Sequence, residues 1–242
     1  MSLCNILGVN ISAINMEAAL NYIKENLTEL QGKYICISNV HTTVMSYEND
    51  KYRRIQNQAV LALPDGKPLS IVCKKRGFQE VDRVTGPDLM KEIFACSKEQ
   101  GYTHFFYGST LETLKLLEEN LKRDYQLPIA GIYSPPFRRL TEEENKKVVE
   151  KINQSHADFI WVGLGAPKQE QWMYEHQNQV HGLMIGVGAG FDYFAGNIKR
   201  APMWMQKCSL EWLYRLLQEP KRLFKRYLIT NTKFLWLIAR GK

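Results

Sequence analysis

The 242-residue sequence lacks the signatures of several large protein classes. It has no C-x-x-C pair, so neither a zinc site nor a redox dithiol is expected. No apolar run approaches the roughly 18 residues of a membrane-spanning helix, and no charged segment followed by an apolar one opens the chain. We therefore expect a cytoplasmic protein that is neither secreted nor threaded through a bilayer. Its scattered cysteines should be free thiols: Cys4, Cys36, Cys73, Cys96 and Cys208.

Motifs of common cofactor and metal chemistry are missing as well. There is no G-x-G-x-x-G and no G-x-x-x-x-G-K-[ST], which removes support from a nicotinamide-dependent oxidoreductase and from a kinase. There is also no D-x-D pair to hold a metal against a nucleotide diphosphate, no H-E-x-x-H and no G-x-S-x-G. We expect no cofactor and no metal site, and a metal-independent transfer reaction rather than hydrolysis.

What the sequence does have is a strong charge asymmetry. The formal net charge is +7. Residues 1–198 contain 21 Lys and Arg against 23 Asp and Glu, whereas residues 199–242 contain 11 against 2. All of the positive excess therefore lies at one end. Such an arm indicates an anionic partner, either nucleic acid or membrane lipid.

Hydropathy patterns predict alternating strands and helices. Strands are expected at 5–9, 33–38, 60–63, 103–108, 128–132, 158–163 and 183–187, and helices at 16–30, 87–101, 111–125 and 145–154, the last after a capping box of Thr141 and Glu144. This alternation predicts a Rossmann-like α/β fold, a mostly parallel sheet with helices on both faces. We assign it to residues 1–196, followed by a helical appendage at 197–242 in which Pro220 starts a new helix.

The appendage has two opposed stripes at about 100° per residue. Arg215, Arg222, Arg226 and Lys233 fall on one stripe, and opposite them fall Leu210, Leu213, Leu217, Phe224, Leu228, Leu235 and Ile238. This makeup is typical of a helix in a membrane interface, so we expect docking onto an anionic membrane surface. Two alternatives stay open: a helix that packs on its own domain with a solvated charged face, and a nucleic-acid arm on a nucleotide-binding module. The second needs no broad apolar face.

A glycine-rich loop follows the predicted strand at 158–163. Gly163 and Gly165 allow a tight turn and a close approach to a ligand, Lys168 can add a charge for phosphate, and Gln169 can hydrogen-bond a sugar or a base. An ordinary strand-to-helix turn explains this motif about as well.

A second glycine-rich loop follows the strand at 183–187. It contains Gly186, Gly188 and Asp192. Two such loops at one sheet edge indicate a nucleotide diphosphate as ligand. Asp192 can contact a ribose or a base, or it can merely cap the next helix.

Two further strand ends carry polar groups. Asp65 follows the strand at 60–63, where a carboxylate can act as general base, although Asp-Gly after proline is also a standard turn. Arg83 can neutralise phosphate, and Asp88 favours a helix N-terminus. After the strand at 33–38 come four polar residues that can face the same crevice: Ser38, Asn39, His41 and Thr42.

These motifs together resemble the WecG/TagA/CpsF family of bacterial glycosyltransferases over nearly the whole chain. The most specific segments are Gly-Leu-Gly-Ala-Pro-Lys-Gln-Glu at 163–170 and the series Arg-Ala-Pro, Leu-Glu-Trp-Leu-Tyr-Arg, Glu-Pro-Lys-Arg and Arg-Tyr-Leu at 200–228. The resemblance implies transfer of a sugar, often N-acetylmannosamine, from UDP to a polyprenyl-diphosphate-linked sugar at the inner face of the cell membrane. The product would enter wall teichoic acid or exopolysaccharide.

The resemblance also implies roles for individual residues. Asp65 would be the general base of an inverting transfer, and Arg83 would lie near the leaving diphosphate. Asn39 and Gln169 would position sugars, while the loops at Gly163 and Gly186 would hold UDP. From the appendage, Arg215 and Arg222, with Arg226 or Lys225 as a third, would reach the active site and stabilise the charge that develops as the glycosidic bond breaks. A homo-oligomer is left open, and no nucleic-acid partner is expected.

Overall fold

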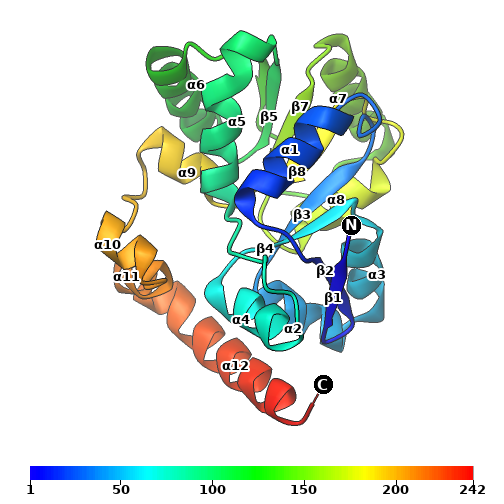
Figure 1. The fold of residues 1–242 in the computed structure, drawn as a ribbon. Coiled ribbons are helices and arrows are strands. Elements are labelled where there is room, and N and C mark those ends of the chain that lie inside the picture. Colours follow the sequence, from blue (N-terminus) through cyan, green and yellow to red (C-terminus); the bar gives the residue numbers. More distant parts are fainter. Residues whose placement is uncertain (242) are drawn as a thin grey trace.

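The computed structural model describes residues 1–241, and Lys242, the last residue of the expected appendage, lies outside them. Its centre is a six-stranded sheet in which every pairing is parallel. The strand order is β4-β3-β8-β7-β5-β6, with β3 at Tyr34–Ser38, β4 at Leu61–Pro64, β5 at His104–Gly108, β6 at Ile129–Tyr133, β7 at Phe159–Gly163 and β8 at Leu183–Gly186. The predicted Rossmann-like α/β fold is confirmed (Figure 1).

The predicted strand at 5–9 is wrong, because the chain turns back in its middle. β1 (Leu3–Ile6) and β2 (Val9–Ser12) form a separate antiparallel ribbon. Leu7 and Gly8, which join them, have φ of 52° and 86°. Such a two-residue turn suits the twist of paired strands, but it usually contains Asn-Gly or Asp-Gly. Here Leu7 precedes the glycine instead, so the sequence of the turn reads as part of an apolar run.

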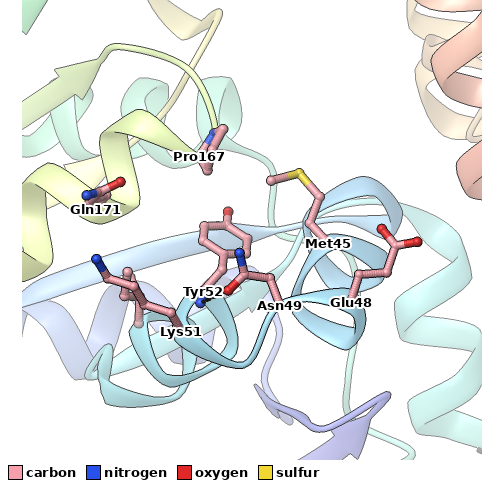
Figure 2. Close-up of a pocket in the computed structure, with 8 residues that line it drawn as sticks. Met45, Glu48, Asn49, Lys51, Tyr52, Pro167 and Gln171 are labelled. Carbon is pink, nitrogen blue, oxygen red and sulfur yellow. Dashed lines mark hydrogen bonds between the residues drawn. The ribbon is translucent and has the colours of Figure 1, made fainter. Parts of the chain in front are cut away.

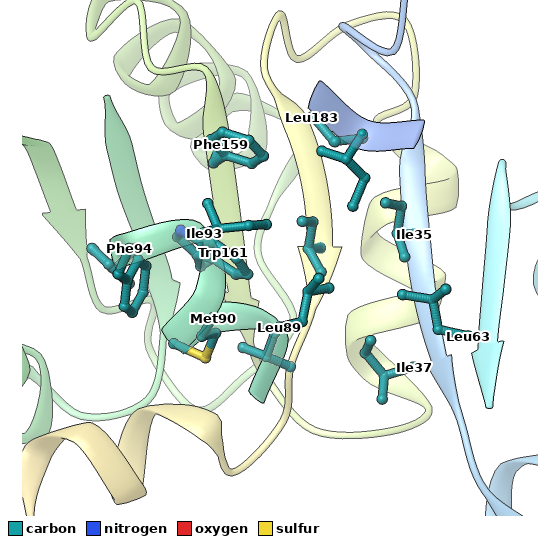
Figure 3. Packing of buried hydrophobic residues seen from close by; sticks show 14 of the residues in the cluster. Ile35, Ile37, Leu63, Leu89, Met90, Ile93, Phe94, Phe159, Trp161 and Leu183 are labelled. Carbon is teal, nitrogen blue, oxygen red and sulfur yellow. The ribbon is translucent and has the colours of Figure 1, made fainter. Parts of the chain in front are cut away.

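One face of the sheet is covered by α1 (Met16–Asn26), α5 (Gly86–Gln100), α6 (Leu111–Tyr125) and α9 (Gly190–Ala195). Figure 3 shows Met90, Ile93 and Phe94 of α5 packed against strand residues such as Trp161. Alternate strand residues point to the other face, toward α7 (Glu142–Gln154) and α8 (Lys168–Glu175), and the Tyr34 hydroxyl donates to the Ile55 carbonyl of α3 (Asp50–Gln58). Burial on both faces explains the continuous apolar runs in the sequence.

The capping box of Thr141 and Glu144 is confirmed, but it marks an earlier start than the predicted residue 145. The Thr141 hydroxyl accepts the Glu144 backbone N–H at 3.2 Å, and the Thr141 N–H donates to the Glu144 carboxylate at 2.8 Å. Thr141 is therefore the N-cap and α7 begins at Glu142. Two other helices directly follow strands at the site, α2 (Val40–Glu48) after β3 and α4 (Lys67–Lys75) after β4.

The C-terminal region consists of α10 (Met203–Lys207), α11 (Glu211–Gln218) and α12 (Pro220–Ala239). Pro220 starts α12, as predicted. In Figure 1, α12 runs along the lower edge of the molecule beside α2. Phe234 and Leu237 anchor it in a third apolar cluster with residues of β1, β2 and α4. Among the described residues, none of the helices combines the length and apolarity needed to cross a bilayer.

The outward face of α12 is largely apolar. Phe224, Leu228 and Leu235 are 59%, 55% and 65% exposed. Arg226 and Lys233 are only partly exposed, and Lys233 pairs with Glu48 of α2. The opposed stripes are therefore present, with the apolar stripe turned to solvent and much of the basic stripe turned to the body. The alternative of a helix that packs on its own domain is met in part: α12 packs on the body, but its exposed face carries apolar side chains as well as charged ones.

Candidate active site

Four predicted loops follow four neighbouring strands at one edge of the sheet. Ser38 of β3 is in register with Pro64 of β4, and β8 lies between β3 and β7. The carboxyl ends of these strands therefore carry Asp65, Asn39, Gly186 and Gly163 side by side. In open α/β sheets this edge is where ligands bind.

Asp65 lies directly after β4, and its backbone N–H donates to the Ser38 carbonyl at 2.7 Å. Gly66 follows with φ of 102°, a backbone region that favours glycine, so the chain can turn into α4 at once. Burial raises the pKa of the Asp65 carboxyl to about 6, the Arg83 and Arg215 charges lower it, and the Glu211 and Asp88 charges raise it. A carboxyl group with this pKa is suited to accept a proton near neutral pH.

An alternating row of charges lies beside Asp65. Arg83 Nη1 is 3.5 Å from Glu211 Oε2, and Arg200 Nε is 3.2 Å from Glu211 Oε1. Arg200 Nη2 in turn lies 2.7 Å from Asp88 Oδ1. Asp88 is fixed by the Thr85 hydroxyl, which donates to Oδ2 at 2.7 Å at the N-cap of α5. Residues from two loops, α5 and α11 therefore meet at the candidate base.

Arg215 reaches this group, and Arg222 does not contact it. The Arg215 guanidinium lies 5.9 Å from the centre of the Tyr193 ring, and its charge acts on both Asp65 and Tyr193. The side chain of Arg222 is 57% exposed and pairs with Glu219 of its own appendage. Glu219 also lies 3.7 Å from Arg215 Nε.

His41 and Arg226 form a second polar group, between α2 and α12. Burial lowers the pKa of His41, the Arg226 charge lowers it further, and the Glu48 charge raises it. His41 Nδ1 and Arg226 Nε are buried without a hydrogen-bond partner among the described residues. The protein therefore leaves two buried polar atoms unsatisfied between α2 and α12.

Ser38, Asn39 and Thr42 mainly serve the protein itself. The Ser38 hydroxyl is fully buried and donates to Gln56 Oε1 at 2.6 Å. Asn39 is the N-cap of α2, where its Oδ1 accepts the Thr42 N–H at 3.1 Å and the Thr42 hydroxyl accepts the Asn39 N–H at 2.9 Å. Asn39 stays partly exposed, so of the three it is the one that can also face a ligand.

Gln169 joins the two glycine loops. Its Oε1 accepts the backbone N–H of Gly165 at 3.2 Å and that of Gly188 at 3.0 Å. Gly165 and Gly188 have φ of 77° and 54°, which glycine adopts without strain. Gly163 and Gly186 leave no room for a side chain, since a Cβ would lie 2.6 Å from the Phe191 ring and 2.7 Å from Met173 Cε. The prediction that two glycine-rich loops lie together at one edge of the sheet is confirmed.

Lys168 and Asp192 lie at the rim of these loops. Lys168 is exposed in the first turn of α8. Asp192 lies in the first turn of α9, where its Oδ1 is 3.3 Å from the Asn197 amide nitrogen that donates to it.

The fully buried carboxyl group of Glu170 supports the two glycine loops through Gln169. The sequence alone assigns Glu170 no role. The Gln169 amide Nε2 donates to Glu170 Oε1 at 2.8 Å, which turns Gln169 Oε1 toward the loops. Burial raises the pKa of Glu170, while hydrogen bonds, the Gln169 amide foremost, lower it. Glu170, Arg200 and Glu211 all belong to the segments on which the family resemblance rests, and only that signal could have identified them.

Two hollows of the surface border the site, one at Pro167 of the first glycine loop and one at Arg200. A depression of about 400 Å³ lies between α2, α3 and α8, and Figure 2 shows Met45, Tyr52 and Pro167 around it. A smaller one of about 210 Å³ is lined by Tyr193 and Arg200 on the other side. Within residues 1–241, no group of three His, Cys, Asp or Glu side chains is placed to hold a metal ion.

Fold and site together define a Rossmann-like α/β enzyme with a carboxylate base candidate, arginines and two glycine loops at one sheet edge. The chain belongs to the glycosyl transferase WecG/TagA/CpsF family, whose model matches residues 4–242, and it is a glycosyltransferase. A relative from Bacillus spizizenii (strain ATCC 23059 / NRRL B-14472 / W23) is 31% identical over 198 residues, which are 81% of this chain and 75% of the relative. It is named N-acetylglucosaminyldiphosphoundecaprenol N-acetyl-beta-D-mannosaminyltransferase.

Proposed function

We propose that this glycosyltransferase moves N-acetylmannosamine from a UDP-sugar to a polyprenyl-diphosphate-linked sugar, with inversion and without a metal. The name of the Bacillus relative supports both the transferred sugar and the lipid-diphosphate acceptor. The product would enter wall teichoic acid or exopolysaccharide.

The observation that carries the proposal is the surroundings of Asp65. Its carboxyl group stands at the ligand-binding edge of the sheet, with a pKa of about 6 and with the charges of Arg83 and Arg215 acting on it. A base and positive charge at one point suit a reaction that removes a proton while a diphosphate leaves.

In the proposed step, the acceptor hydroxyl oxygen attacks the anomeric carbon from the face opposite the diphosphate. The new C–O bond forms as the bond to the UDP oxygen breaks, and the hydroxyl proton passes to Asp65. UDP leaves with the bonding electron pair, so its negative charge grows in the transition state. Arg83 and Arg215 stabilise that charge, with Arg222 joining them when its pairing with Glu219 is released.

The loops around Asp65 bind the two substrates. The Gly163–Gly165 and Gly186–Gly188 loops hold UDP, with Lys168 near its phosphates and Asp192 near its ribose or base. Gln169 positions the donor by holding both loops together. On the other side of Asp65, Asn39 and the group formed by His41 and Arg226 face the sugars, and Ser38 and Thr42 keep that segment in shape.

We assign the catalytic domain to residues 1–196 and docking on the inner face of the cell membrane to residues 197–242, which also supply Arg215 and Arg222 to the catalytic site. The outward face of α12 supports this division. Its exposed apolar side chains alternate with exposed Lys221 and Lys225. The guanidinium carbon of Arg240 lies 3.7 Å from the ring centre of exposed Trp236. Such a face can enter the headgroup region while its cations contact anionic lipid.

A panel of UDP-sugars tests the proposal. Each is incubated with the enzyme and a short-chain polyprenyl-diphosphate N-acetylglucosamine, and acceptor-dependent UDP release is measured with and without a chelator. We expect release with UDP-N-acetylmannosamine and no effect of the chelator. Strict dependence on magnesium or manganese contradicts the mechanism. Preference for another UDP-sugar contradicts N-acetylmannosamine as the transferred sugar.

A further inference from the structure

Glu211 brings a negative charge from the appendage into the group around Asp65. It is the first residue of α11, yet its carboxylate lies between two arginines that precede α5 and α10 in the chain, Arg83 and Arg200. The side chains of Glu211, Arg83 and Arg200 are only 16%, 18% and 24% exposed. An ion pair shielded in this way is far less weakened by solvent than a surface pair.

The charges in this group alternate along one path. Asp88 pairs with Arg200, Arg200 with Glu211, and Glu211 with Arg83. The Asp88 end is fixed to the N-cap of α5 by Thr85, whereas Arg83 at the other end has Glu211 as its ion-pair partner among the described residues. Two carboxylates balance two guanidinium groups, so removal of Glu211 leaves the mostly buried Arg83 without an ion-pair partner among the described residues.

We propose that Glu211 is a positioning residue that holds Arg83 beside Asp65. The inference rests on the proposed roles of Asp65 and Arg83. In this role Glu211 acts through Arg83 and takes no proton during the reaction. Arg200 and Asp88 fix the place of Glu211 from behind.

The electrostatics around Asp65 make the proposal testable by the direction of one change. Asp65 faces Arg83 before α5, Asp88 on α5, and Glu211 and Arg215 on α11. Arg83 lowers the pKa of Asp65 by more than Glu211 raises it. Loss of the Glu211 charge alone therefore lowers the pKa of Asp65, whereas loss of Glu211 together with the placement of Arg83 raises it.

The experiment compares full-length wild type with Glu211→Gln, using Glu143→Gln as the matched control. Glu143 forms an exposed pair with Lys147 on α7 and touches none of the site residues. For each protein, kcat/KM for the UDP-sugar is measured from about pH 5 to 8. We expect Glu211→Gln to lower kcat/KM by at least about tenfold. The acidic limb of the plot of kcat/KM against pH should move to higher pH. The control should match wild type in both.

A double-mutant cycle shows whether Glu211 acts through Arg83. In the Arg83→Gln background, Glu211→Gln should cost less than about twofold in kcat/KM, because the group it positions is already gone. Glu211→Asp, which keeps the charge, should retain more activity than Glu211→Gln and an acidic limb close to that of wild type. It also keeps the test decisive if Glu211→Gln does not fold, as judged by circular dichroism.

The outcomes separate the two proposals. An acidic limb of Glu211→Gln that stays in place or moves to lower pH, or full additivity with Arg83→Gln, overturns the positioning role. Turnover by Asp65→Asn near the wild-type rate instead overturns the proposed function, whatever Glu211 does.

Discussion

Replacing Asp65 by Asn should greatly slow turnover and make the protein more stable. The amide has nearly the shape of the carboxyl group but cannot accept the hydroxyl proton. We expect kcat to fall by about 10² to 10⁴-fold, the usual contribution of a general base. The fold should gain stability because burial makes the ionised Asp65 unfavourable, raising its pKa to about 6 from an ordinary 3.8. That difference corresponds to about 3 kcal/mol.

The stability gain should depend on pH in a defined direction. Between pH 3.8 and about 6 the folded wild type holds more protons than the unfolded chain, so it loses stability as the pH rises through this window. Asp65→Asn has no such titration. Its advantage should be small near pH 4 and reach its full size above pH 6, as a rise in Tm of roughly 5 to 10 °C.

Thermal unfolding at several pH values and acceptor-dependent UDP release measure both effects on one protein sample. Asp124→Asn is the control, since the hydrogen bond from Arg123 lowers the pKa of this exposed carboxyl and its replacement should bring no stability gain at neutral pH. A stability difference for Asp65→Asn that does not change with pH would refute the burial argument. Retained turnover would refute the role as base.

Two further perturbations test the loops and the appendage. Gln169→Leu removes the acceptor shared by the Gly165 and Gly188 amides, so KM for the UDP-sugar should rise about tenfold or more while the protein stays folded; an unchanged KM in steady-state kinetics would remove Gln169 from donor binding. Leu228→Glu with Leu235→Glu places charge on the exposed face of α12, so co-sedimentation with anionic vesicles should be lost while turnover of a water-soluble acceptor stays normal. Undiminished vesicle binding would assign docking to another surface.

The sheet could be predicted from the sequence because its strands are buried on both faces. Continuous runs such as 158–163 have few alternative structures, and glycine or polar residues mark their ends. The ribbon at the N-terminus could not be predicted, because Leu7 occupies a turn position that normally contains glycine or asparagine. Local patterns also place the loops at the edge of the sheet, since parallel strands bring their carboxyl ends together.

Contacts between distant segments were beyond the reach of the sequence. Periodicity separates the basic and apolar stripes of α12, but it does not say which stripe faces the body. That choice depends on Phe234 and Leu237 filling an apolar cluster with the N-terminal ribbon. Likewise, Arg83 and Glu211 are far apart along the chain, and only the fold shows that they meet. The use of Gln169 as a link between loops, rather than as a free amide, is hidden for the same reason.

The most direct test of the central claim is transfer itself. Purified enzyme is mixed with UDP-N-acetylmannosamine and short-chain polyprenyl-diphosphate N-acetylglucosamine, and the lipid product is examined by mass spectrometry and by NMR of the new anomeric carbon. We expect a product one N-acetylhexosamine heavier, with an inverted, β linkage, formed by Asp65→Asn at least about 100-fold more slowly than by wild type. A retained α linkage, or formation of the product by Asp65→Asn at a rate near that of wild type, would contradict the proposed mechanism.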